Sequence, residues 1–235
     1  MKLSPMKLTH PPMRRDEVKV WQRFLQSKGI YSGSINDSFD EATAAATAKY
    51  AERNYLRGDD VFVISFDRPD RDHFAKKDGS VDLRPSFHDV LSKIAYGYYL
   101  LTGSEIVVTD GYRLPGDQAA QMHKKAKDGR RALDIYKDQS LVEPIWVGYD
   151  KAHKAGAGEQ GEIEAMAAVI QEQVNHGHYV SKHLTGVAFD VRKMSSGSDQ
   201  RAFVTAAEEV LSRSGGQLIT NERGGDPHFH VQLDR

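Results

Sequence analysis

The sequence lacks cysteine, so disulfides, thiolate nucleophiles and cysteine-liganded metal sites are all excluded. It also lacks an uninterrupted apolar run of about 18 residues, the length at which a transmembrane helix is considered. Neither sign of charge dominates: 32 lysines and arginines face 33 aspartates and glutamates. We therefore expect neither membrane insertion nor a nucleic-acid partner.

The beginning of the chain, from Met1 to Met6, lacks the apolar stretch of a secretory signal. We therefore expect synthesis in the cytoplasm without a signal peptide, and a separate release route for any external action. Because cysteine is absent, a metal site must use histidine, aspartate or glutamate. The ten histidines are the first candidates.

Residues 1–58 have the pattern of a small all-α domain. Trp21 and Leu25 fall on one face of a helix predicted over residues 16–28. Asp40 is a typical N-cap for a second helix. A unit of this kind is about the smallest that folds alone.

The rest of the chain predicts a linker at residues 59–79 and a domain over residues 80–235. The domain is expected to be α+β, with a small antiparallel sheet flanked by helices. Its predicted helices are 86–102, 117–128, 161–175 and 199–213, and its predicted strands are 106–109, 187–192, 217–220 and 229–233. Pro144 and the glycines near residue 156 predict a long irregular loop over residues 137–161.

A histidine pair near the C-terminus has the spacing of a strand. Side chains alternate in a strand, so His228, His230 and Gln232 share one face. The two histidines are about 6.8 Å apart along the backbone. One can bind a metal while the other reaches a substrate.

A second segment supplies further ligands. Gly186 permits a turn between His183 and a short strand, in which alternation places Ala188 and Asp190 together. Asp190 can then face the cavity that His183 reaches. Two histidines and one aspartate leave a fourth position for water, the pattern of catalytic zinc. Zinc in such a site activates water and polarises a carbonyl.

These segments resemble the LAS metallopeptidases, an M15-like group of zinc D-Ala-D-Ala carboxypeptidases and dipeptidases, endolysin peptidases and murein endopeptidases. The matching residues are Ser181, His183, Gly186, Ala188, Asp190, His228 and His230. Thr109–Arg113 is similar to the family's strand-end segment with Gly-Tyr-Arg. The resemblance covers roughly residues 80–235, and the combined motifs are fairly specific.

The resemblance implies a role for each matching polar residue. It implies zinc as the cofactor, with His183, Asp190 and His230 as ligands. His228 would assist catalysis, Arg113 would bind a substrate carboxylate or carbonyl, and Ser181 would contact substrate or brace its loop.

The general base departs from the family pattern. Several members carry an acidic residue three positions before the last zinc histidine, where this chain has Pro227. Asp226 is the preferred candidate because it lies closest. Glu222 and His228 stay open as alternatives.

The N-terminal unit resembles the short peptidoglycan-binding domain of wall hydrolases. The matching residues are Val18, Trp21-Gln22, Leu25, Gly29, Gly33, Ile35-Asn36-Asp37, Phe39-Asp40, Thr43 and Ala46. Trp21, Leu25 and Phe39 are expected in the core. The resemblance implies peptidoglycan as the partner.

Together these patterns predict a monomeric, zinc-dependent peptidoglycan peptidase that acts at the cell wall, released by phage lysis or dedicated secretion. The expected target is an amide bond containing D-Ala, cut as a carboxypeptidase or endopeptidase. Cleavage of L-Ala-D-Glu is the alternative within this class. A wall-binding protein with a structural metal and a metal hydrolase of another substrate are alternatives outside it.

Overall fold

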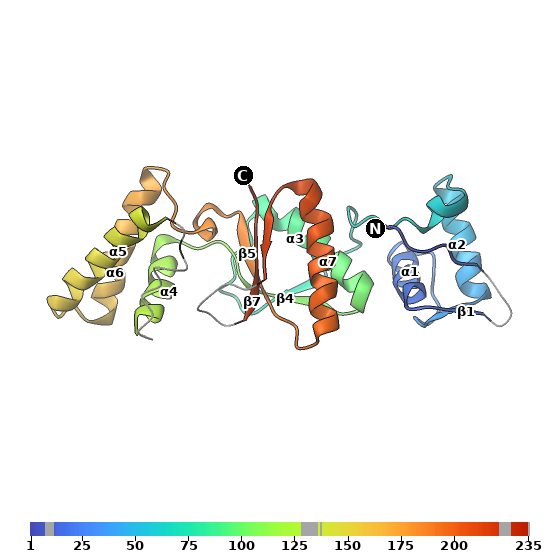
Figure 1. Cartoon of the computed structure of the whole chain (residues 1–235), viewed down its shortest axis with the longest axis horizontal. Helices are drawn as coiled ribbons and strands as arrows, with labels where there is room; N and C mark the ends of the chain where they lie inside the picture. The colour runs from blue at the N-terminus through green and yellow to red at the C-terminus, as the bar shows by residue number, and fades with distance from the viewer. Residues whose placement is uncertain (8–11, 128–135, 137, 221–226, 235) are drawn as a thin grey trace. The chain divides into compact units, whose positions relative to one another are not determined.

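The computed structural model describes residues 1–235 except 8–11, 128–135, 137, 221–226 and 235. The predicted α+β class is confirmed (Figure 1). The helices are α1 (Asp16–Ser27), α2 (Glu41–Arg53), α3 (Pro85–Thr102), α4 (Pro115–Lys127), α5 (Gln139–Lys154), α6 (Gly158–Asn175) and α7 (Gly197–Ser214), with 3-10 turns η1 (Gly58–Phe62) and η2 (Lys182–Thr185). The strands are β1 (Met13–Arg14), β2 (Ser38–Phe39), β3 (Phe74–Lys76), β4 (Ile106–Asp110), β5 (Ala188–Arg192), β6 (Gln217–Ile219) and β7 (His228–Gln232). None of the described helices is both long and apolar enough to span a membrane.

The chain divides into two compact units that alternate along the sequence. The first comprises Met1–Ala75, Val90–Ile106 and Met194–Arg213, and the second comprises Lys76–Asp89, Val107–Lys193 and Ser214–Arg235. The predicted domains were instead continuous, with limits at residues 58 and 80. The histidine motifs and Arg113 all belong to the second unit.

The N-terminal helices form as the sequence predicts. Asp40 caps α2 by accepting a hydrogen bond from the amide of Thr43 at 2.9 Å. Trp21 is fully buried on α1 and donates from Nε1 to the Thr47 hydroxyl at 2.8 Å. The region also contains β1 and β2, paired antiparallel. Strands of two residues carry no readable alternation, which explains why only helices were predicted here.

The predicted linker over residues 59–79 contributes to the core of the first unit. Its buried side chains are Val61, Phe62, Ile64, Phe66 and His73. Phe62 packs edge-on against Trp21, with ring centroids 5.3 Å apart. The abundant charge and glycine in this stretch obscured these spaced apolar residues.

The predicted loop over residues 137–161 is wrong, because this stretch contains α5 and the start of α6. Val142, Ile145 and Trp146 are buried at helical spacing, which outweighs the cost of Pro144 inside α5. Gly156 and Gly158 have φ of 69° and 71°, and they form the tight turn between the two helices.

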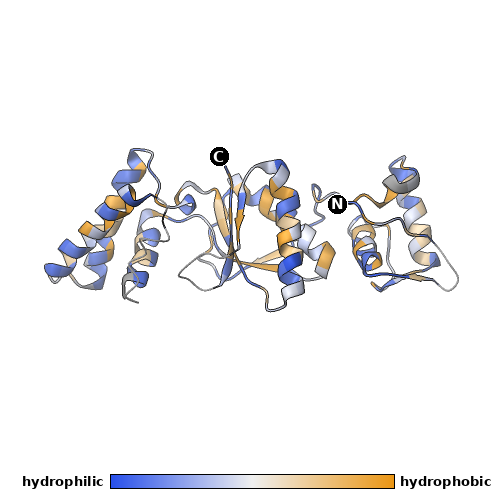
Figure 2. Ribbon diagram, viewed as in Figure 1, coloured by the Kyte–Doolittle hydropathy of each residue, from blue (hydrophilic) through white to orange (hydrophobic). Residues whose placement is uncertain are grey.

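The main sheet has the strand order β3-β4-β5-β7-β6. β5 pairs antiparallel with both β4 and β7, and β6 pairs antiparallel with β7. Phe189, Phe229 and Val231 are buried, and Phe87 of α3 packs against Phe189 with ring centroids 5.4 Å apart. The central strands are correspondingly hydrophobic in Figure 2. The opposite side chains of β5 and β7 are therefore available for a polar site.

Helix α6 packs against both α5 and α4, and the three helices form a bundle in the second unit (Figure 1). The buried core of this bundle comprises Ala119, Met122, Val142, Ile145, Trp146, Met166, Ile170 and Leu184. Seven of these residues come from the three helices. The eighth, Leu184, comes from the turn η2.

Candidate metal centre

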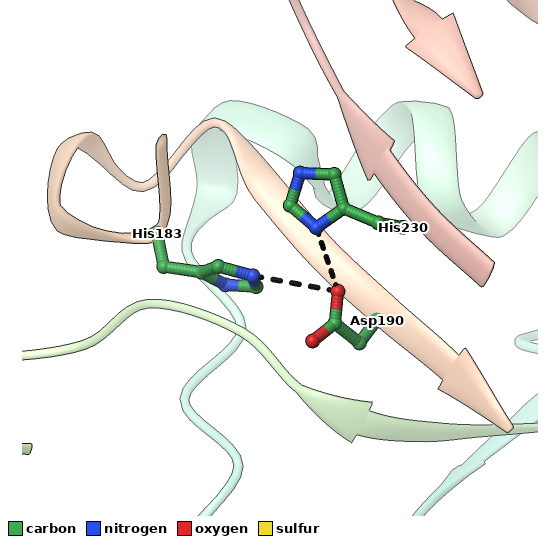
Figure 3. A group of neighbouring side chains, drawn as sticks. All are labelled: His183, Asp190 and His230. Carbon is green, nitrogen blue, oxygen red and sulfur yellow. Dashed lines mark hydrogen bonds and ion pairs between the residues drawn. The ribbon is translucent and has the colours of Figure 1, made fainter. Parts of the chain in front are cut away.

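Three predicted ligands converge in the second unit. His183 comes from η2, Asp190 from β5 and His230 from β7, and their ligand atoms lie within 4.8 Å of one another (Figure 3). His230 Nδ1 is 2.8 Å from Asp190 Oδ1, and His183 Nε2 is 3.4 Å from the same oxygen. All three side chains are buried. This group can hold a metal ion.

Strand pairing places two of the ligands. Asp190 and His230 are direct partners in the antiparallel register of β5 and β7. Such partners have Cβ atoms about 4.5–5.5 Å apart and point to the same face. Phe189 and Val231 are the next pair along and occupy the opposite, apolar face. The ligand pair is therefore fixed by the same register that builds the core.

The third ligand is placed by a capped turn. The Ser181 hydroxyl accepts a hydrogen bond from the His183 amide at 3.3 Å at the start of η2. Gly186 ends the turn with φ of 69°, a left-handed conformation that favours glycine. The predicted turn at Gly186 is confirmed. Ser181 braces the loop, and its contact with substrate stays a prediction.

A backbone contact selects the nitrogen of His183 that faces the site. Nδ1 lies 2.6 Å from the Gly111 carbonyl oxygen, which can only accept a hydrogen bond. The neutral ring therefore carries its hydrogen on Nδ1 and leaves the lone pair of Nε2 directed at Asp190. Histidine ligands of metals are commonly held by such a contact. The donor set and its bracing therefore fit a metal ion.

Asp190 is kept ionised. In the metal-free site burial would raise its pKa, but the positive charge of a protonated His183 and the hydrogen bonds that His183 and His230 then donate outweigh burial and hold the pKa well below 3.8. Arg113 Nη2 lies 3.8 Å from Asp190 Oδ2 and adds a positive charge. A carboxylate must be deprotonated to bind a metal, so these surroundings suit a ligand.

Arg113 is held rigidly beside the ligands. Asp110 accepts hydrogen bonds from its Nε at 3.0 Å and its Nη2 at 2.6 Å, and Gln118 accepts from Nη1 at 3.0 Å. Burial lowers the pKa of Arg113. The hydrogen bond and the charge of Asp110 raise this pKa by more than burial lowers it, so the net shift is upward. The guanidinium stays charged.

His228 lies next to the ligand group on the same strand face. Its Nε2 is 3.7 Å from Asp190 Oδ2. His230 Nε2 lies 3.3 Å from Gln232 Oε1, which confirms the predicted common face of the three alternate residues. The His228 side chain is 16% exposed against 7% for His230. His228 is thus the more accessible imidazole.

The predicted base falls on a segment outside the described residues, as Asp226 and Glu222 both belong to 221–226. Asp226 as base and Glu222 as its alternative stay predictions.

Sequence reasoning missed the residues that hold Arg113 and His183. They are Asp110, the Gly111 carbonyl, Gln118 and Tyr136, whose hydroxyl accepts from Gln118 Nε2 at 2.9 Å. Gln118 is fully buried near the start of α4. Its position five residues after Arg113 was visible in the sequence, but the contact depends on how α4 leaves the strand.

Comparisons with known proteins add no family assignment. No protein-family model, curated protein or solved structure matches this chain. Function is therefore inferred from the chemistry of the site and the motifs around it.

Proposed function

We propose that the protein is a zinc-dependent peptidase that hydrolyses an amide bond of peptidoglycan. The observation that carries this proposal is the buried convergence of His183, Asp190 and His230. Two imidazoles and one carboxylate are ligands that suit zinc. Among the described residues, the group contains these three ligands. Three protein ligands leave a coordination position for water. A zinc ion held there supplies a Lewis acid and a water of lowered pKa.

His228 and Arg113 provide the groups that handle the substrate. The partly exposed imidazole of His228 sits beside Asp190 and can donate a proton to the departing amine. Arg113 has five N–H groups, of which three bond Asp110 and Gln118. Nη1 and Nη2 each carry a second N–H group, and this pair can bind a substrate carboxylate or carbonyl side by side. This arrangement supports recognition of a peptide next to the scissile amide.

The N-terminal helices support peptidoglycan as the substrate. Their sequence resembles that of a wall-binding domain, and Trp21, Leu25 and Phe39 have the predicted core positions with 0%, 0% and 2% exposure. A wall-binding unit joined to a peptidase would concentrate the enzyme on its polymer. We favour a bond containing D-Ala, with L-Ala-D-Glu as the alternative, in an endolysin-like role.

The test is incubation of the full chain with purified sacculi and zinc, followed by mass spectrometry of the soluble fragments. New amine and carboxylate ends in the released peptides would support the proposal and identify the bond. The matched control is His183→Ala, which should release nothing. Binding to sacculi without soluble product, by zinc-loaded wild-type protein, would instead favour a wall-binding protein with a structural metal.

A further inference from the structure

The metal ligand His183 and its neighbour Leu184 are anchored in different parts of the second unit. His183 is directed at Asp190 and His230 (Figure 3). Leu184 is 5% exposed and belongs to the core of the three-helix bundle. Consecutive residues of one short turn thus connect the site to the bundle.

Leu184 is the one member of that core that lies outside the three helices. It belongs to one buried cluster with Met122 of α4, Trp146 of α5 and Ile170 of α6, so all three helices contribute to the core that holds it. Protein cores are packed closely, and a side chain held in this way has little freedom to shift. Because His183 and Leu184 are consecutive residues of a four-residue turn, we expect a displacement of Leu184 to move His183.

A second connection runs through α4. The buried Gln118 accepts the hydrogen bond from Arg113 Nη1 and donates to Tyr136. Val180, just before the capped turn, is partly buried against the same bundle core. The bundle therefore contacts both the ligand turn and the arginine beside it.

We propose that the three-helix bundle positions the metal site, with Leu184 as the positioning residue for His183. Ligand distances in metal sites lie within about 0.2 Å of standard values, so we expect a movement of the turn to weaken binding. The coupling is reciprocal: zinc binding must order the bundle as much as the bundle favours zinc binding. This inference rests on the zinc binding of the proposed function.

The first test measures zinc affinity by competition with a chromophoric chelator, at a temperature where every variant is folded. Leu184→Ala should weaken zinc binding by about 10- to 100-fold, the range found when groups supporting a ligand are removed. The matched control is Leu211→Ala on α7 in the first unit, also 5% exposed, which should bind close to wild type. Leu184→Met keeps the volume and should restore affinity.

The second test uses only the wild-type chain, so it does not depend on whether a variant folds. Amide hydrogen exchange of the wild-type chain is compared with and without zinc. We expect slower exchange in α5 and α6 on zinc binding, and no change in α7. The inference would be overturned, with the proposed function left standing, by either of two results. One is equal zinc affinity for Leu184→Ala and Leu211→Ala, and the other is hydrogen exchange in α5 and α6 that zinc does not change. A wild-type chain that binds no zinc would remove the proposed function as well.

Discussion

Two groups of one carboxylate and two histidines lie in the second unit, and they differ in how the carboxylate is used. One comprises His183, Asp190 and His230, and the other His123, Glu162 and His153. In the first, both imidazoles approach the same oxygen, Asp190 Oδ1. In the second, each oxygen of Glu162 has its own imidazole, at 2.6 Å and 2.8 Å.

This difference distinguishes a group that can hold a metal ion from a structural brace. Ligand atoms that crowd around one oxygen can close on a single ion, whereas Glu162 lies between its histidines and joins α4, α5 and α6. In the first group, the Gly111 carbonyl also holds His183 from outside the group. Residue types alone therefore do not distinguish the two groups, whereas the direction of each donor does.

The largest expected effect comes from removing each carboxylate in turn. Asp190→Ala should reduce bound zinc from about one ion per chain to near zero and abolish peptidase activity, because an open three-ligand zinc site has no ligand to spare. Glu162→Gln should keep its zinc and most of its activity. Elemental analysis of the dialysed proteins, paired with the sacculus assay, makes the comparison. Two zinc ions per wild-type chain, one of them lost in Glu162→Gln, would mean that the second group also binds metal.

An intermediate effect is expected from acid. Hydrogen bonds from His123 and then His153 lower the pKa of Glu162 below its ordinary value of 4.5. A lowered folded pKa means that Glu162 contributes stability above pH 4.5, and that this contribution disappears as pH falls through the folded value. The zinc-free protein should therefore lose bundle stability only in strong acid.

Thermal unfolding of the zinc-free chain from neutral pH to about pH 3 would measure this loss. Glu162→Gln has no titrating carboxylate at this position, so its melting temperature should fall less over the acid range. The difference between the two acid profiles therefore measures the contribution of the Glu162 carboxylate and its hydrogen bonds. Parallel acid profiles for the two proteins would show that the brace contributes no pH-dependent stability.

The same contrast explains how far the sequence could predict the site. Alternation in a strand was enough to place His228, His230 and Gln232 on one face, because that rule is local. The pairing of Asp190 with His230 joins residues 40 positions apart, and register of this kind is set by the whole sheet. The motif resemblance supplied this ligand set where spacing alone left the choice of histidine open.

The structural brace around Glu162 could not be predicted from the sequence for a related reason. His123, Glu162 and His153 lie on three helices, and their meeting depends on the rotation of each helix about its axis. Pro144 and the glycines at 156 and 158 had also suggested that α5 was absent. Once that helix was missed, the partner of Glu162 could not be placed.

The smallest expected effect concerns the turn that carries His183, a feature that the helical brace lacks. Ser181→Ala removes the acceptor for the His183 amide, a loss of about 0.5–2 kcal/mol when such caps are removed. If that cost falls on the zinc-bound form, affinity should weaken by less than about 30-fold. Ser181→Thr keeps a hydroxyl acceptor and should bind zinc like wild type. The kinetics separate bracing from substrate contact, because a brace leaves KM unchanged once zinc is saturating. A raised KM for Ser181→Ala at saturating zinc would assign Ser181 to the substrate instead.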